Sequence, residues 1–359
     1  MTRLQAIHQT LVGGAPHSAI WNEALALGGV LREWGFHSEI FAEELHADLK
    51  RDASLFASYR PQAHDVLIYH YSTGSPLTER VLVSERPLIL FYHNLTPGTL
   101  IENANPRMAA QLQRARVDLH RLREHTCLAV AHSEFSRRDL LDIGYDQSVM
   151  IPLLFSDALF AIEPDAATLA RYGNARTYLL SVGRLAPNKR HEDAIKTLYF
   201  YRRINPDARL LLVGAPDNME RYVVWLRDFA RSLGLSEQVV FCGSVPDAEL
   251  AAYYHLARVL LCMSEHEGFC VPLVEAMRFD LPIVAHHGSA IPETLGGAGV
   301  LIRSKNFPVI AEVIDQLNTD SILRKQIVAR QRRRAAELDR GIVVQQLKTH
   351  IERALESLR

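Results

Sequence analysis

Short runs of apolar residues alternate with helical patterns along the first part of the chain. Apolar residues at helical spacing from Ile20 to Leu31 predict a helix that ends near Gly35. Repeated alternation of strand, turn and helix is typical of a parallel sheet covered by helices on both faces. The strands are expected at Ser38–Phe41, Asp65–Tyr71, Leu88–His93 and Leu128–Ala131.

The same pattern restarts after a loosely structured stretch that runs from Ile151 to Asn174 and is typical of a hinge. Helices are expected at 191–204 and 218–233, and the segment from about 308 to 359 is helical throughout. The hydrophobic pattern therefore predicts a second doubly wound unit of similar size. Its strands are expected at Tyr178–Val182, Leu210–Val213, Val239–Cys242, Val259–Met263, Ile283–Ala285 and Val300–Ile302.

Length and composition agree with two globular domains. The chain has 359 residues, of which 48% are hydrophobic and 23% charged. A net charge of -1 gives no general attraction to nucleic acid, so no nucleic-acid partner is expected. The N-terminal segment lacks the apolar core of a signal peptide, and no run reaches the roughly 18–20 apolar residues of a membrane span. We expect a cytoplasmic protein.

The cysteines and histidines give no metal signature. Four cysteines occur without a C-x-x-C spacing, which predicts neither a disulfide framework nor a zinc site. The sixteen histidines include no His-x-x-x-His pair, and no Asp-x-Asp is placed to hold a divalent ion. We therefore expect no metal site and a metal-independent activity.

The most informative stretch is Glu265–Met277 (EHEGFCVPLVEAM), which lies between two apolar segments. Pro272 suits the first turn of a helix, where a missing N–H costs nothing. Glu267 then lies in the preceding loop and Glu275 about one turn inside the helix, so their carboxylates can reach different parts of an elongated ligand. Backbone amides at such a helix N-terminus are open to an anion or to sugar hydroxyls. These amides belong to Gly268, Phe269, Cys270 and Val271.

A second stretch, Ser181–Lys189 (SVGRLAPNK), follows a predicted strand and carries two cations, Arg184 and Lys189. Loops at the carboxyl ends of parallel strands are where such folds bind ligands. Two cations from one loop suit a diphosphate, whose leaving oxygen gains charge as a glycosidic bond breaks. An exposed basic loop is the alternative interpretation.

Three further features each allow two interpretations. Glu275 is either an ordinary surface carboxylate or, given its apolar neighbours, a buried one that needs a partner. His93, at a strand end, is either structural or part of a site. Residues 107–125 predict a basic amphipathic helix, which either docks on anionic lipid or packs on its own sheet.

The two stretches, in this order, resemble the retaining glycosyltransferases of family 4, which have the GT-B fold of two Rossmann-like domains facing across a cleft. LLLVGAP, VVFCGSVPDAELAAYY, GSAIPETL and AHSEFSRRDLLDIGY also resemble this family. The resemblance covers nearly all of residues 128–302. The first 125 or so residues match only in layout and in a glycine-rich first turn.

The resemblance implies domains at 1–152 and 153–339, with the last helix (about 340–359) returning to the first, acceptor-binding domain. Arg184 and Lys189 would hold the diphosphate, and Glu267 would contact the donor sugar. The following amides, from Gly268 to Val271, would hold sugar hydroxyls or phosphate. The remaining roles would be ribose binding by Glu275, close backbone approach to phosphate at Gly14, and contact of His93 with the transferred sugar.

One position departs from the family, which often has glycine directly after the lysine, where this chain has Arg190. This difference leaves the phosphate role intact and affects only the local shape of the loop.

The function implied is retaining transfer of a sugar from a nucleotide-diphosphate donor, either a UDP- or a GDP-sugar. The acceptor would be a hydroxyl of a glycan, a lipid-linked or a small molecule, as in bacterial surface polysaccharide assembly. No cofactor is implied, because the nucleotide-sugar is a substrate. A sugar-nucleotide epimerase of the same fold and a non-catalytic sugar-nucleotide binding protein are the alternatives.

Overall fold

The computed structural model describes residues 6–14, 18–173 and 176–358. The chain divides into two compact units. The first runs to Gly98 and adds Arg107–Ser156 and the segment from Asp339 onward; the second comprises Thr99–Pro106 and Asp157–Leu338. Among the described residues, no helix is both long enough and apolar enough to cross a membrane.

The first unit is built on a seven-stranded sheet in the order β3-β2-β1-β4-β5-β6-β7, in which every pairing is parallel. The central strand β4 is buried along its whole length, as expected of a strand covered on both faces. The strands are β1 (Ala6–Gly14), β2 (Ile40–Leu45), β3 (Ser54–Leu55), β4 (Asp65–Tyr71), β5 (Leu88–Tyr92), β6 (Thr126–Ala131) and β7 (Ser148–Met150).

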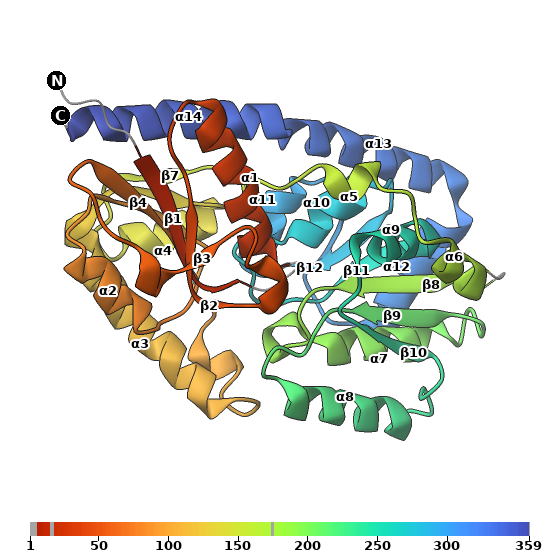
Figure 1. Cartoon of the computed structure of the whole chain (residues 1–359). Helices are drawn as coiled ribbons and strands as arrows, with labels where there is room; N and C mark the ends of the chain where they lie inside the picture. Colours follow the sequence, from red (N-terminus) through yellow and green to blue (C-terminus); the bar gives the residue numbers. More distant parts are fainter. Residues whose placement is uncertain (1–5, 15–17, 174–175, 359) are drawn as a thin grey trace. The chain divides into compact units, whose positions relative to one another are not determined.

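Alternate residues of β4 face two different layers of helices (Figure 1). Val66 and Ile68 pack with α1 and α14, whereas the Tyr69 hydroxyl lies 3.2 Å from Thr78 of α2 and the Tyr71 hydroxyl donates to a carbonyl of α3. This alternation follows from the two-residue period of a strand. The helices of this unit are α1 (Ala19–Glu33), α2 (Leu77–Val83), α3 (Pro106–Leu122), α4 (Glu134–Leu141) and α14 (Arg340–Ser357).

The second unit has a six-stranded parallel sheet in the order β10-β9-β8-β11-β12-β13. A large apolar core on one face joins these strands to α9, α10, α11 and α13. Its strands are β8 (Tyr178–Val182), β9 (Arg209–Val213), β10 (Val239–Gly243), β11 (Ala257–Cys262), β12 (Ile283–His286) and β13 (Val300–Ile302).

The other face of this sheet is covered by α7 and α12, which pack on one another, and α8 lies beside α7 (Figure 1). The helices of this unit are α5 (Ala158–Ala161), α6 (Ala166–Tyr172), α7 (His191–Tyr201), α8 (Glu220–Ser232), α9 (Asp247–Leu256), α10 (Val271–Arg278), α11 (Ile291–Leu295), α12 (Phe307–Thr319) and α13 (Ser321–Glu337).

Three expected elements differ from the structure. The segment expected to be helical throughout from about 308 to 359 is divided into α12, α13 and α14, which end at Thr319, Glu337 and Ser357. The strand expected at Ser38–Phe41 lies at Ile40–Leu45, because its pairing with β1 extends to the register Gly14↔Leu45. The hinge expected to be loosely structured contains the short helices α5 and α6, and the Asp165 carboxylate caps α6 by accepting from the amide of Thr168.

The basic helix expected at 107–125 is α3, and its apolar side is buried within its own unit. Leu112, Leu119 and Leu122 are buried there, and carbonyls of α3 accept hydrogen bonds from Tyr71 and Tyr145. The packing interpretation therefore holds for the apolar side of this helix.

Candidate functional site

The loop after β8 is shaped by a close backbone approach. Gly183 has φ 137° and Gly214, at the end of the neighbouring β9, has φ 149°. A Cβ atom on Gly214 would lie 2.0 Å from the carbonyl oxygen of Gly183, so only glycine fits there. The chain then makes a turn of 3₁₀ helix at Pro187–Lys189 before α7 begins at His191.

Arg184 brings a cation to this loop with its side chain. Its carbonyl oxygen accepts a hydrogen bond of 3.1 Å from Nε2 of His191, which fixes the backbone. Within the described part of the chain, its guanidinium makes no hydrogen bond or ion pair. Burial lowers the pKa of Arg184, and the charges of Asp217 and Glu267 partly oppose this. A partly buried arginine without a counter-ion is a ready site for an anion.

The loop that contains Glu267 is tied to the Arg184 loop by hydrogen bonds. The side-chain amide of Asn188 donates to the carbonyl of His266 (3.1 Å), and the amide of Glu265 donates to the carbonyl of Asn188 (2.9 Å). The Ser289 hydroxyl accepts from the amide of Glu267 at 2.6 Å. The two stretches singled out in the sequence thus form one substructure at the carboxyl edge of the second sheet.

Lys189 and Glu267 meet in this substructure. Nζ of Lys189 lies 2.6 Å from Oε2 of Glu267, and their side chains are 19% and 9% exposed. Burial disfavours the ammonium ion, but the Glu267 carboxylate more than offsets this and raises the pKa of Lys189. Lys189 is therefore charged at neutral pH and forms an ion pair with Glu267.

The helix expected at Pro272 is α10, which begins at Val271. Cys270 precedes it in the left-handed conformation, with φ 76°. Within the described residues, the amides of Phe269, Cys270 and Val271 donate no hydrogen bond. The N-terminus of α10 can therefore donate to an anion or to hydroxyls.

Glu275 lies inside α10, where it is half-buried and has a hydrogen-bond partner. The hydroxyl of Tyr254, a buried residue of α9, donates to Oε2 of Glu275 at 2.6 Å. Burial raises the pKa of Glu275 to about 7, although the Tyr254 hydrogen bond opposes the rise and Asp247 adds to it. Tyr254 was not singled out from the sequence, where it is one of two adjacent tyrosines in an apolar helix.

This raised pKa predicts a pH-dependent stability. The folded chain holds the Glu275 proton more tightly than the unfolded chain, whose carboxyl has the ordinary pKa of 4.5. Stability is therefore lost as pH rises from about 4.5 to about 7. Relative to Glu275→Gln, we expect the wild-type chain to lose roughly 2–3 kcal/mol of unfolding free energy between pH 5 and pH 8, measured by urea unfolding. A difference that does not change with pH would contradict this.

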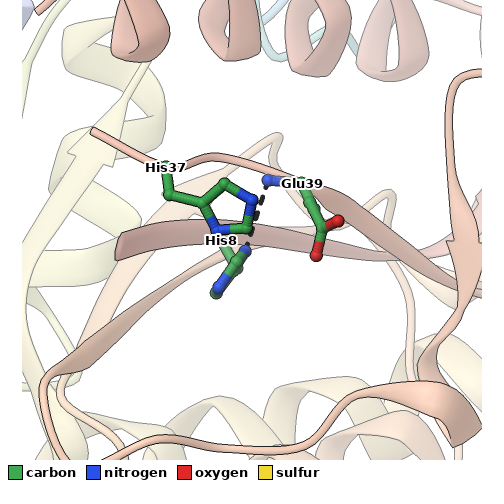
Figure 2. Close-up of side chains that lie close together, drawn as sticks. All are labelled: His8, His37 and Glu39. Atoms are coloured by element: carbon green, nitrogen blue, oxygen red, sulfur yellow. Dashed lines mark hydrogen bonds between the residues drawn. The ribbon is translucent and has the colours of Figure 1, made fainter. Parts of the chain in front are cut away.

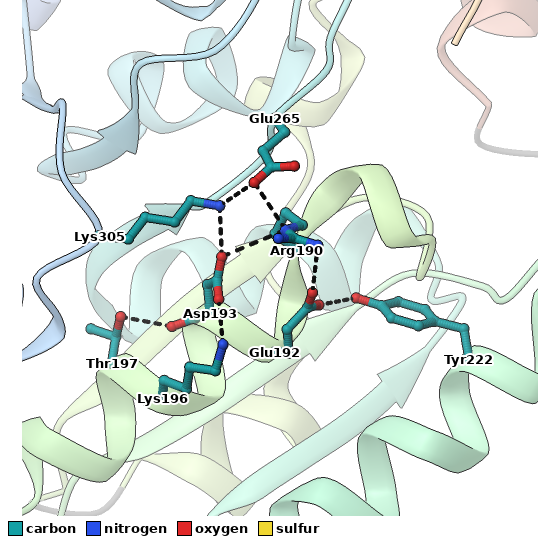
Figure 3. Close-up of polar contacts among 8 residues, drawn as sticks. All are labelled: Arg190, Glu192, Asp193, Lys196, Thr197, Tyr222, Glu265 and Lys305. Atoms are coloured by element: carbon teal, nitrogen blue, oxygen red, sulfur yellow. Dashed lines mark hydrogen bonds and ion pairs between the residues drawn. The ribbon is translucent and has the colours of Figure 1, made fainter. Parts of the chain in front are cut away.

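Arg190 keeps the backbone shape that a glycine would give. It is left-handed, with φ 54° and ψ 46°. Its guanidinium is held by three carboxylates, those of Glu192 (3.2 Å), Asp193 (3.7 Å) and Glu265 (3.1 Å). Figure 3 shows these residues together with Lys305, which bridges Asp193 (2.7 Å) and Glu265 (2.5 Å). The network joins the start of α7 to the Glu267 loop, and its ion pairs offset the strain at Arg190.

Substitutions at Arg190 distinguish the effect of its left-handed backbone on stability from the effect of its ion pairs. Both Arg190→Ala and Arg190→Gly lose the ion pairs, but only glycine relieves the left-handed strain. We expect the glycine variant to be more stable than the alanine variant by about 1 kcal/mol in urea unfolding. At the exposed Arg330 in α13 the order should reverse, since alanine is the better helix residue. An alanine variant at position 190 at least as stable as the glycine variant would refute the explanation.

The two remaining candidate residues belong to the first unit. Gly14 is the last residue of β1, and the residues that follow it (15–17) lie outside the described part of the chain. His93 directly follows β5, and its Nε2 lies 3.0 Å from Nδ1 of His70 and 3.5 Å from Oε2 of Glu23. The other eight candidates all belong to the second unit.

The cluster around His93 was missed in the sequence. His70, His93 and His132 lie near the carboxyl ends of the adjacent strands β4, β5 and β6, and Glu23 reaches them from α1. A signal existed, because polar residues at the ends of neighbouring parallel strands meet at one edge of the sheet. Short-range spacing such as His-x-x-x-His does not contain this signal, because the three histidines are far apart in the sequence.

Three groups of side chains in the described residues have metal-like spacing. In the group of Cys262, Glu267 and Cys270, the Lys189 ammonium already occupies the carboxylate. His8, His37 and Glu39 form a second group (Figure 2), in which His37 and Glu39 are exposed and Nδ1 of His8 accepts from the amide of Glu39 at 3.3 Å. The third group is Glu23, His70 and His93.

Residues 171–334, which contain the Arg184 and Glu267 loops, match the family model for glycosyl transferases group 1. This part of the second unit is therefore similar to the group 1 glycosyl transferases. This chain is 31% identical over 173 residues to a GDP-mannose-dependent alpha-(1-6)-phosphatidylinositol monomannoside mannosyltransferase of Mycolicibacterium smegmatis, covering 45% of this chain and 44% of that protein. It is 32% identical over 147 residues to mannosylfructose-phosphate synthase of Agrobacterium fabrum, covering 39% and 32%. The chain thus spans less than half of these relatives.

Solved structures match nearly the whole chain. Anabaena Alr3699/HepE, solved in complex with UDP and glucose, matches 97% of this chain and 100% of its own with a TM-score of 0.76 and 18% identity. Sucrose-phosphate synthase from Thermosynechococcus elongatus covers 99% and 100% with a TM-score of 0.73 and 17% identity. Together with the two parallel sheets, these matches confirm the expected GT-B fold class.

Proposed function

We propose that this chain is a hexosyltransferase that moves a sugar from a nucleotide-diphosphate donor to a hydroxyl, with retention at the anomeric carbon. The observation that supports it is that Arg184, whose guanidinium has no ion pair among the described residues, and Lys189 lie in the same strand-end loop. Two cations beside one carboxylate offer net positive charge to a departing diphosphate. Relatives named as mannosyltransferases and the UDP complex of HepE support a sugar nucleotide as ligand.

Each donor residue has a role that fits its surroundings. Arg184 and Lys189 stabilise the diphosphate, Glu267 contacts the donor sugar, and the amides from Gly268 to Val271 bind sugar hydroxyls or phosphate. Glu275, held by Tyr254, accepts hydrogen bonds from ribose. In the first unit, His93 contacts the transferred sugar and the backbone at Gly14 approaches phosphate.

The cations of this chain take the place that a divalent ion would have beside the diphosphate. We therefore propose transfer without metal or other cofactor. GDP-mannose is the first donor to test, because the Mycolicibacterium smegmatis relative is named for it. UDP-glucose is the second, because it is bound in a HepE structure. The acceptor is a hydroxyl of a glycan, a lipid-linked or a small molecule.

The test is a thermal-shift screen in EDTA against GDP, UDP, ADP, TDP and their common sugar conjugates. A nucleotide at 100 times its dissociation constant stabilises by about 2.7 kcal/mol, so Tm should rise by a few degrees with one base. Arg184→Ala should abolish the rise. No rise with any nucleotide at millimolar concentration would refute the donor site, and binding without turnover would leave a sugar-nucleotide binding protein.

Peripheral membrane contact through residues 107–125 is part of the proposal, for a protein acting at the cytoplasmic face. Since the apolar side of α3 is buried, contact would use its arginines, of which Arg116 pairs with Asp139 and Arg121 with Glu79. Co-sedimentation with vesicles of anionic and of zwitterionic lipid tests this. Equal binding to both would refute a charge-based contact.

A further inference from the structure

The cluster around His93 is almost closed to solvent. The side chains of Glu23, His132 and His93 are 1%, 3% and 5% exposed, and that of His70 is fully buried. The tautomer of a buried imidazole is constrained by its neighbours, because each ring nitrogen must donate to an acceptor or accept from a donor. The proton positions in this cluster therefore follow from its hydrogen bonds.

The chain of hydrogen bonds starts at Gln9. Its side-chain nitrogen donates to the carbonyl of Ala24 at 2.9 Å, and because a carbonyl only accepts, the orientation of this amide is fixed. The amide oxygen of Gln9 then faces Nε2 of His70 at 2.8 Å. An oxygen acceptor there requires the proton of His70 to lie on Nε2. Nδ1 of His70 is left with a lone pair.

This lone pair determines the state of His93. Nδ1 of His70 lies 3.0 Å from Nε2 of His93, so Nε2 of His93 must carry a proton and donate it. The Glu23 carboxylate oxygen, 3.5 Å from the same nitrogen, favours the same proton. A neutral His93 then has its lone pair on Nδ1. Within the described residues Nδ1 has no hydrogen-bond partner, and it is not among the polar atoms shut off from solvent.

The charges in the cluster agree with neutral rings at His70 and His93. Burial lowers the pKa of His70 to about 3 and that of His93 well below its ordinary value. His132 differs, because Glu23 lies 3.3 Å from its Nε2 and raises its pKa against the effect of burial. The Glu23 carboxylate thus has its counter-ion in His132, and His93 is not needed to neutralise it.

We propose that Gln9 and His70 are positioning residues that hold His93 as the Nε2-protonated tautomer, so that its free Nδ1 accepts a hydrogen bond from a sugar hydroxyl. The inference rests on the proposed function for the source of that hydroxyl, which is the donor sugar or the acceptor. An Nδ1 lone pair selects a hydroxyl that donates. A protonated ring would select phosphate or another anion instead.

The tautomer is tested directly by ¹⁵N NMR of the protein labelled at histidine, which needs no activity. We expect His93 to show a protonated Nε2 and an unprotonated Nδ1 at pH 7. The matched variants are His70→Asn, whose amide oxygen can replace the acceptor, and His70→Leu, which is of similar size and cannot. Asn should keep the His93 signals and Leu should change them. A protonated Nδ1 in the wild-type protein would overturn the proposal.

Substrate analogues test the consequence for recognition. Donors and acceptors are changed one hydroxyl at a time to the deoxy and the deoxyfluoro form. Where the hydroxyl donates to His93, both forms should lose about tenfold in kcat/KM, since fluorine cannot donate. The penalty should persist in His70→Asn and disappear in His70→Leu. Whether a donor analogue or an acceptor analogue shows this penalty identifies which substrate supplies the hydroxyl.

Three other outcomes decide against the proposal or separate it from the proposed function. A penalty for the deoxy but not the fluoro form would mean that His93 donates, which overturns it. One equivalent of a divalent metal in the purified protein would also overturn it, because Glu23, His70 and His93 have metal-like spacing and a metal would take the Nε2 lone pair. If no sugar is transferred at all, the proposed function fails while the NMR result still decides the tautomer.

Discussion

Lys189→Met and Glu267→Gln are each expected to lower kcat for sugar transfer by about 10²–10³-fold, the typical loss when one group that stabilises transition-state charge is removed. The two side chains pair at 2.6 Å and are mostly buried. Each single variant therefore also leaves the other charge buried without its partner. We expect a loss of roughly 2–3 kcal/mol in urea unfolding for either one.

The double variant Lys189→Met/Glu267→Gln distinguishes a functional pair from a structural one. Neither member of the pair is then left charged without the other, so much of the lost stability should return while transfer stays low. The control is Arg332→Met, which breaks an exposed ion pair with Asp280 and should change stability by less than about 1 kcal/mol and leave transfer intact. Recovery of transfer in the double variant would refute the assignment of these residues to catalysis.

The sequence predicted the second unit better than the first. Buried parallel strands read as short apolar runs, so Asp65–Tyr71, Tyr178–Val182 and Val300–Ile302 were placed residue for residue. Helix starts were predicted where local chemistry fixes them, as at Pro272. The short helices α5 and α6 were not, because seven residues or fewer give no clear helical period.

Contacts between distant segments could not be predicted from the sequence. The resemblance to family 4 suggested the Lys189 loop and the Glu267 loop, but not that Asn188 ties them together. Arg190 looked like a change of loop shape, whereas its left-handed backbone is retained by ion pairs to residues as distant as Glu265. Ion pairs that offset backbone strain in this way form between residues far apart in the sequence, so residue spacing along the sequence does not predict them.

Of the single substitutions proposed in the second unit, Gly214→Ala is expected to lower the free energy of unfolding most. The new Cβ would lie 2.0 Å from the carbonyl oxygen of Gly183, at a backbone φ of 149° that side chains rarely adopt. Neither strand end can move freely, because the amide of Gly183 donates to β9 and the amide of Gly214 to β10. We expect a loss of about 4 kcal/mol, measured as the urea midpoint.

Gly234→Ala is the matched control for Gly214→Ala, since it has φ 69° but no atom within 4 Å of a new Cβ. It should cost only about 1 kcal/mol, the strain of a left-handed alanine. In Gly214→Ala the carbonyl of Gly183 would be displaced, and Gly183 directly precedes Arg184. We therefore expect the folded Gly214→Ala variant to bind nucleotide more weakly in the absence of urea. Gly234→Ala should bind nucleotide normally. Equal stability of the two variants would show that the strand ends separate easily. The Arg184 loop would then owe its shape to the His191 hydrogen bond and the Asn188 contacts rather than to the glycine pair.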